Sequence, residues 1–166
     1  NFQYQSNLVY KAYTDALQIN PALVQSIAQI PFLPIRFFKS HTISTGLFEP
    51  AIVFESSGTT GNLNSKHFVK DISLYEESFL KGFAAFYGNI QDWCIIGLLP
   101  SYLERNSSSL VYMVDKLIAL SQDSNSGFYL YDHDKLQKVV EELKKANKKI
   151  LLIGVTYALL DFAEQF

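Results

Sequence analysis

The chain has 166 residues, the length of one ordinary domain, and its formal charge of −2 excludes a nucleic-acid binder that works by neutralising many phosphates. Hydrophobic residues make up 48% of the sequence, which excludes an acidic disordered tail. The single cysteine, Cys94, excludes an internal disulfide and fits a reducing compartment. No apolar run reaches the roughly 18 residues that a membrane span needs, so we expect a soluble cytoplasmic protein with no membrane span and no nucleic-acid partner.

Residues 1–50 are predicted to form a helical and extended lead-in. Apolar residues at helical spacing predict a helix over residues 8–19. Asn20 and Pro21 end that helix and begin a second, short helix that runs to Ile27, because proline suits the first helical turn. The segment 35–38, which follows Pro31 and Pro34, is the first predicted strand.

From residue 51 onwards, short apolar runs alternate with helical patterns. Strands are predicted over residues 51–54, 93–99, 127–131 and 150–155. Helices are predicted over residues 71–87, from Asn106 or Ser107 to about 120, after an N-cap at Asp132, and over 156–166. The run 93–99 is apolar throughout, which indicates a strand buried on both faces. This alternation predicts an α/β fold, with a mostly parallel sheet flanked by helices, in a single domain or the N-terminal fragment of a larger one.

The residues that follow the strand at 51–54 favour anion binding. Two glycines and four hydroxyl side chains occur in the run Ser56-Ser57-Gly58-Thr59-Thr60-Gly61. Glycines let consecutive backbone N–H groups point at one anion, so a loop of this kind leaving a strand suits an oligophosphate. The alternative is an ordinary Ser/Gly turn. The run is not a Walker-type loop, because no Gly-Lys-Ser/Thr closes it, and it lacks the dinucleotide fingerprint spacing.

The order Ser57-Gly58-Thr59-Thr60-Gly61 resembles the phosphate-loop signature of the adenylate-forming superfamily, which includes acyl-CoA synthetases, firefly luciferase and peptide-synthetase adenylation domains. The doubled serine and the segments 98–105 and 152–156 look most like the acyl-protein synthetase (LuxE) and phenylacetate–CoA ligase branch. The resemblance covers about residue 51 to the end of the sequence. It implies that ATP with Mg²⁺ activates a carboxylic acid as an acyl-adenylate. The acyl group then passes to a thiol of coenzyme A, a carrier protein or an enzyme cysteine.

The resemblance also implies ATP phosphate contacts for Ser56, Ser57, Gly58, Thr59, Thr60 and Gly61. The superfamily string usually continues through Pro-Lys-Gly, whereas this chain continues Asn-Leu-Asn-Ser before Lys66 and His67. Lys66 is therefore either a displaced phosphate-binding lysine or a solvated loop lysine. His67 is either a donor near the phosphates or a polar loop residue without a task.

Two further strand ends carry candidate residues for an acyl pocket. Pro100-Ser101-Tyr102 fits the superfamily's acyl-pocket segment, with Leu103 where a histidine would fall. Tyr102 either walls this pocket or packs in the core, and Arg105 either meets a carboxylate or phosphate or pairs with a surface acid such as Glu104. Gly154 brings backbone close either to a ligand or to a neighbouring helix. The apolar and aromatic content favours a fatty or aryl acid, although the same residues also build any core.

The remaining chemically capable side chains are predicted to have structural roles. Cys94, inside an apolar run, is expected to pack as a small hydrophobe rather than carry an acyl group. His41 and His133 have no partner at metal-ligand spacing.

The superfamily's later Tyr-Gly-x-Thr-Glu-like segment, whose acid helps to hold magnesium, is not in this sequence. We therefore expect an N-terminal portion of a longer ligase-like protein, which alone forms no adenylate. The alternative is a noncatalytic α/β interaction module that keeps a remnant phosphate loop and uses an exposed sheet edge.

Overall fold

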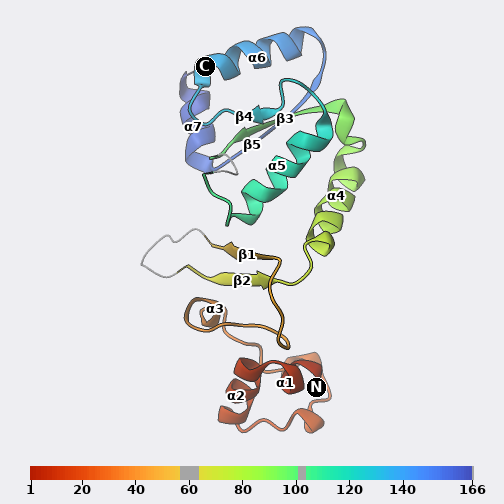
Figure 1. The fold of residues 1–166 in the computed structure, drawn as a ribbon, viewed down its shortest axis with the longest axis vertical. Helices are drawn as coiled ribbons and strands as arrows, with labels where there is room; N and C mark the ends of the chain where they lie inside the picture. Colours follow the sequence, from red (N-terminus) through yellow and green to blue (C-terminus); the bar gives the residue numbers. More distant parts are fainter. Residues whose placement is uncertain (57–63, 101–103, 166) are drawn as a thin grey trace. The chain divides into compact units, whose positions relative to one another are not determined.

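A computed structural model describes residues 1–56, 64–100 and 104–165 of the chain. The chain divides into two compact units, residues 1–72 and residues 73–166 (Figure 1). Both units contain helices and strands, but their sheets differ: unit 1 has a two-stranded sheet and unit 2 a three-stranded one.

Unit 1 is built from short elements: α1 (Phe2–Ser6), α2 (Leu8–Ala16), the 3₁₀ turns η1 (Pro21–Leu23) and η2 (Ile27–Gln29), α3 (Phe37–Ser40), β1 (Ile52–Glu55) and β2 (Lys66–Val69). The predicted helix 8–19 ends early, at Ala16, because Gln18 adopts a left-handed backbone with φ of 57°. The Ile19 N–H then donates to the Thr14 carbonyl at 3.2 Å, which closes the helix end. The predicted second helix is two separate 3₁₀ turns, η1 and η2.

The predicted strand at 35–38 is wrong, because this segment enters the helical turn α3. The Phe37 N–H donates to the Pro34 carbonyl at 3.0 Å, and the His41 N–H donates to the Phe37 carbonyl at 2.8 Å. The turn places the Phe37 ring edge-on to Tyr13, with ring centroids 5.6 Å apart. Packing against α2 therefore outweighs the strand propensity of the aromatic run.

The strand predicted at 51–54 is confirmed as β1, but it belongs to a hairpin and not to the parallel sheet. β1 pairs antiparallel with β2, with Ile52 opposite Val69 and Glu55 opposite Lys66. β2 has no counterpart in the prediction, because four residues with polar and apolar side chains in two adjacent pairs carry no strand periodicity.

Unit 2 confirms the predicted alternation of strands and helices. Its elements are α4 (Ser73–Tyr87), the 3₁₀ turn η3 (Ile90–Asp92), β3 (Trp93–Leu98), α5 (Ser109–Ser121), β4 (Gly127–Phe128), α6 (His133–Lys145), β5 (Lys149–Gly154) and α7 (Thr156–Gln165). The sheet order is β4-β3-β5 and both pairings are parallel. The Asp132 N-cap of α6 is confirmed, since its side chain accepts from the Lys135 N–H at 3.1 Å. The N-cap of α5 is Ser108, later than either predicted residue.

The core of unit 2 lies on both faces of β3 (Figure 1). Cys94, Ile96 and Leu98 pack among residues of α6 and α7, whereas Ile95 packs among residues of α4 and α5. All four side chains have 0% exposure, which confirms the prediction of a strand buried on both faces. Within the parts of the chain that the structure describes, no helix combines the length and apolar character needed to cross a bilayer.

Candidate phosphate-binding site

The hairpin of unit 1 holds the first residue of the predicted phosphate loop, Ser56, and pairs it with Ser65. Of that loop, Ser57, Gly58, Thr59, Thr60 and Gly61 lie outside the described residues, and Ser56 lies within them. The Ser56 N–H donates to the Ser65 carbonyl at 3.0 Å, and the Ser65 N–H donates to the Ser56 hydroxyl oxygen at 3.1 Å. These bonds extend the ladder by one pair beyond Glu55 and Lys66. Ser56 therefore fixes where the loop leaves the hairpin.

Lys66 lies on β2 rather than in a loop, and it faces a carboxylate across the hairpin. Its Nζ is 3.7 Å from Glu55 Oε1, and Asn64 Nδ2 donates to Glu55 Oε2 at 3.3 Å. The Lys66 side chain remains 56% exposed. Its ammonium group is therefore anchored at the base of the loop and still accessible to an anion.

Lys66 and His67 belong to different cavities, because successive side chains of a strand point to opposite faces. Lys66 lines a polar cleft, described below, while His67 lines a cavity of about 500 Å³ together with Ile43, Phe48 and Lys70. The structure therefore does not bring the two predicted residues to one site.

The polar cleft occupies about 430 Å³ between α3 with its following residues and the open end of the hairpin. Its polar lining comes from Lys39, Ser40, His41, Thr42, Glu55, Asn64 and Lys66. Of these, only Lys66 was a functional candidate from the sequence; the cationic or imidazole side chains of Lys39 and His41 were among those that the sequence reasoning did not select. The available signal was the pair Phe37 and His41, four residues apart after a proline, which marks one helical turn. This turn carries Lys39 and His41 to the cleft.

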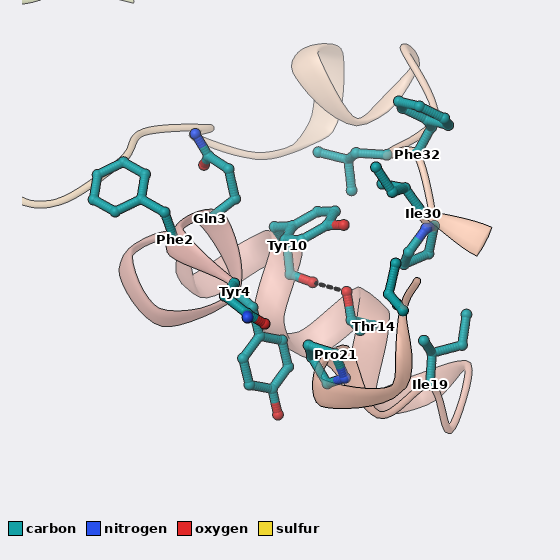
Figure 2. A pocket seen from close by; sticks show the side chains of 13 residues that line it. Phe2, Gln3, Tyr4, Tyr10, Thr14, Ile19, Pro21, Ile30 and Phe32 are labelled. Carbon is teal, nitrogen blue, oxygen red and sulfur yellow. Dashed lines mark hydrogen bonds between the residues drawn. The ribbon is translucent and has the colours of Figure 1, made fainter. Parts of the chain in front are cut away.

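A second, aromatic cavity of unit 1 occupies about 460 Å³ (Figure 2). Figure 2 shows Tyr10 of α2 on the side of Ile30 and Phe32, which come from the segment after η2; Tyr4 of α1 also lines the cavity. The buried Thr14 hydroxyl in its wall donates to the Tyr10 carbonyl at 2.9 Å. Because that polar group is already paired, the wall offers mainly carbon surface, and its volume is typical of small-molecule sites.

The strand ends of unit 2 offer less room. Tyr102 lies outside the described residues. Arg105 is exposed, and within the described residues its guanidinium forms no ion pair. The nearby cavity lined by Leu99, Glu104 and Tyr131 occupies about 130 Å³, below the roughly 300 Å³ at which ligand pockets begin.

Gly154 lies where its backbone meets other core residues. A Cβ atom at this position would lie 2.9 Å from Leu98 Cβ and 3.0 Å from Leu159 Cγ. Such contacts are too short for any side chain, so close packing against β3 and α7 explains the glycine. Its predicted part in an acyl pocket stays a prediction.

The expected packing role of Cys94 is confirmed by its burial. The side chain has 0% exposure, and the Ser126 hydroxyl donates to its Sγ at 3.7 Å. Burial raises the pKa of the Cys94 thiol, so the group stays protonated and poorly nucleophilic.

The donor set of unit 1 fits phosphate oxygens better than a metal ion. Ammonium, imidazole, hydroxyl and amide groups line the polar cleft, and they bind anionic oxygen. Among the described residues, no three His, Cys, Asp or Glu side chains converge as a metal ion requires.

Comparison of the chain with protein-family models, curated proteins and solved structures finds no match. The class that the geometry defines is an α/β protein of two compact units, one of which carries a hairpin whose open end adjoins a cationic cleft.

Proposed function

We propose that the protein binds the phosphates of ATP at the open end of the β1–β2 hairpin and serves to activate a carboxylic acid for transfer to a thiol. The observation that carries the proposal is the anchoring of both loop ends by Ser56 and Ser65, with the Lys66 ammonium at the loop's base. The hydroxyl- and glycine-rich composition of the segment between those ends supports the same function.

In the proposed reaction these residues form no covalent bond with the substrates. In this function ATP supplies the adenylyl group: a bond forms between the acid's carboxylate oxygen and the α-phosphorus, and the bond to pyrophosphate breaks. The chain's own task is to hold the departing pyrophosphate oxygens and to offset their charge, which positioned donors achieve. Lys66 contributes a cation, and loop N–H and hydroxyl groups contribute neutral donors.

The acid in this proposal is fatty or aryl, and the acceptor is a thiol of coenzyme A, a carrier protein or an enzyme cysteine. The aromatic cavity of unit 1 supports an apolar acid, because its volume of about 460 Å³ and carbon-rich lining suit an alkyl chain or a ring (Figure 2). Mg²⁺ accompanies the nucleotide in this proposal.

Thermal unfolding with Mg-ATP tests the nucleotide site. A ligand at 100 times its Kd stabilises the folded protein by about 2.7 kcal/mol, which raises the Tm by several degrees. We expect this shift for the wild-type protein and for Ser78→Ala, an exposed hydroxyl on α4, but not for the loop double variant Gly58→Val, Thr59→Ala. A Tm of the wild-type protein that Mg-ATP does not change would overturn the proposed function. An equal Tm shift in the loop variant would show that ATP binds at a different site.

A second candidate function, self-association through the sheet edge of unit 2, is favoured by the position of β5. Within the described residues β5 pairs only with β3, and its apolar run Ile150–Ile153 is half-buried, whereas β3 is buried from Cys94 to Leu98. Such an edge can accept a strand from a second copy of the chain. Sedimentation velocity over a range of protein concentrations separates the two: concentration-dependent association without a nucleotide response favours this function, and a monomer stabilised by Mg-ATP favours the first.

A further inference from the structure

The polar cleft beside α3 joins two segments that are far apart in the sequence. α3 contacts β2 within unit 1 (Figure 1). The cleft between them is lined by Lys39 and His41 from the α3 segment and by Lys66 from β2. Phe38 and Phe68 supply the apolar part of its lining, and the remaining lining residues carry polar or charged side chains.

The charge of this cleft is positive. Two ammonium groups, on Lys39 and Lys66, face one carboxylate, that of Glu55. Glu55 is already engaged by Lys66 and by the Asn64 amide. Within the described residues Lys39 forms no ion pair, so its charge is available to an incoming anion.

His41 adds an imidazole N–H donor to the lining of the same cleft. Its Nδ1 lies 2.8 Å from the Ser40 hydroxyl, and its ring lies 5.0 Å from the Phe37 ring between centroids. When the Ser40 hydroxyl donates to Nδ1, the neutral ring carries its proton on Nε2 and can donate it to an oxyanion. Ser40 and Phe37 therefore hold the imidazole in place without using its outer nitrogen.

We propose that Lys39 and His41, together with Lys66, bind the terminal phosphate groups of the nucleotide in the polar cleft between α3 and the hairpin. This inference rests on the proposed function, and it adds residues that the loop motif does not contain. A pyrophosphate or triphosphate carries several negative charges close together. Such a ligand can contact both ammonium groups and the imidazole at once, whereas a ligand with a single carboxylate cannot. The volume of about 430 Å³ leaves space for such a group and bound water.

Isothermal titration calorimetry on the full 166-residue chain tests the inference, with pyrophosphate, Mg-ATP and acetate as probes. We expect Lys39→Gln to weaken pyrophosphate and Mg-ATP binding by about tenfold or more, since it removes a charged hydrogen bond. The matched control is Lys70→Gln, which removes the same charge from the separate cavity that His67 lines. We expect that control to stay within about twofold of the wild type, and His41→Gln to weaken both phosphate ligands.

The outcomes separate this inference from the proposed function. Equal losses in Lys39→Gln and Lys70→Gln would show a net-charge effect and overturn the inference. Binding of Mg-ATP that Gly58→Val, Thr59→Ala abolishes but Lys39→Gln leaves unchanged would overturn the inference and keep the proposed function. Pyrophosphate binding that depends on Lys39, without any Mg-ATP binding, would support the cleft as an anion site and overturn the nucleotide function.

Acetate binding as tight as pyrophosphate binding would overturn the assignment to phosphate. Both lysines and His41 have exposed side chains, so circular dichroism should show unchanged folding in all variants.

Discussion

Gly154, at the end of β5, gives a residue-scale test of packing against ligand binding. A methyl group at this position would lie 2.9 Å from Leu98 Cβ and 3.0 Å from Leu159 Cγ, and neither neighbour is the free end of a flexible chain. We expect Gly154→Ala to lower the free energy of unfolding by about 1–3 kcal/mol, the usual result of overpacking a core. Urea unfolding followed by circular dichroism measures the change.

Gly82 provides the matched control, because a Cβ at this position in α4 would meet nothing within 4 Å. Gly82→Ala should instead raise the free energy of unfolding by about 0.5–1 kcal/mol, since alanine favours the helix interior. Stability unchanged by Gly154→Ala, with altered ligand binding in its place, would contradict the packing explanation and restore the predicted acyl-pocket role.

Residues with local signals were predicted from the sequence, and residues placed by tertiary contacts were not. The Asp132 cap and the burial of Cys94 follow from their immediate neighbours in the chain, and both are confirmed. Lys39 and His41 reach the polar cleft only because Phe37 packs on Tyr13 and turns the chain into α3. The spacing of Phe37 and His41 after a proline indicates a helical turn, but no pattern in the residues around position 39 predicts the long-range contact with Tyr13.

At the scale of elements, Glu76 links α4 to α5 and makes the stability of this pair depend on pH. The Tyr112 hydroxyl donates to Glu76 Oε1, and Lys116 Nζ lies 3.1 Å from the same oxygen. The Tyr112 hydrogen bond, followed by that from Lys116, lowers the pKa of Glu76 below its ordinary 4.5. A lowered folded-state pKa contributes stability above the unfolded value, and that contribution is lost as the pH falls through the folded pKa.

We therefore expect Glu76→Gln to lower the free energy of unfolding by about 1 kcal/mol at pH 7. The difference from wild type should shrink as the pH falls below 4.5. Urea titrations at several pH values measure it. Glu77→Gln is the matched control on the same helix, since Glu77 pairs along α4 with Lys81 in an exposed i, i+4 contact. A pH-independent deficit in Glu76→Gln would show that lost packing, and not the carboxylate charge, causes it.

Elements with a helical periodicity or an unbroken apolar run were predicted well, and short paired elements were not. β3, α4, α6 and β5 each span enough residues for their burial pattern to show in the sequence. β2 is a strand because it pairs with β1, and the pairing partner of a four-residue segment cannot be predicted from its own residues. The proposed site divides in the same way: the hydroxyl- and glycine-rich run is a local sequence motif, whereas the lining residues from α3 are brought to the polar cleft by the fold.

At the scale of the whole molecule, the two units differ in how much apolar surface they bury. Among the described residues, Phe54 is the one buried hydrophobic side chain of unit 1, and all the others belong to unit 2. Unit 1 also exposes large apolar side chains, with Leu47 at 99% exposure. Since burial of apolar surface is the main stabilising term, unit 1 should open locally at a smaller free energy than unit 2.

Native-state hydrogen exchange should show this difference directly. We expect the hydrogen-bonded amides of α2 to exchange faster than those of β3 by roughly a hundredfold or more, because α2 contains one buried residue, Thr14, whereas β3 is buried from Cys94 to Leu98. Limited proteolysis should likewise cut within residues 1–72 first and leave a fragment containing unit 2. Mg-ATP should slow exchange in unit 1 selectively, since a ligand held by β1, β2 and α3 stabilises the unit that binds it. Equal protection of α2 and β3 would mean that both units unfold in a single cooperative step, and would contradict the weaker packing inferred for unit 1.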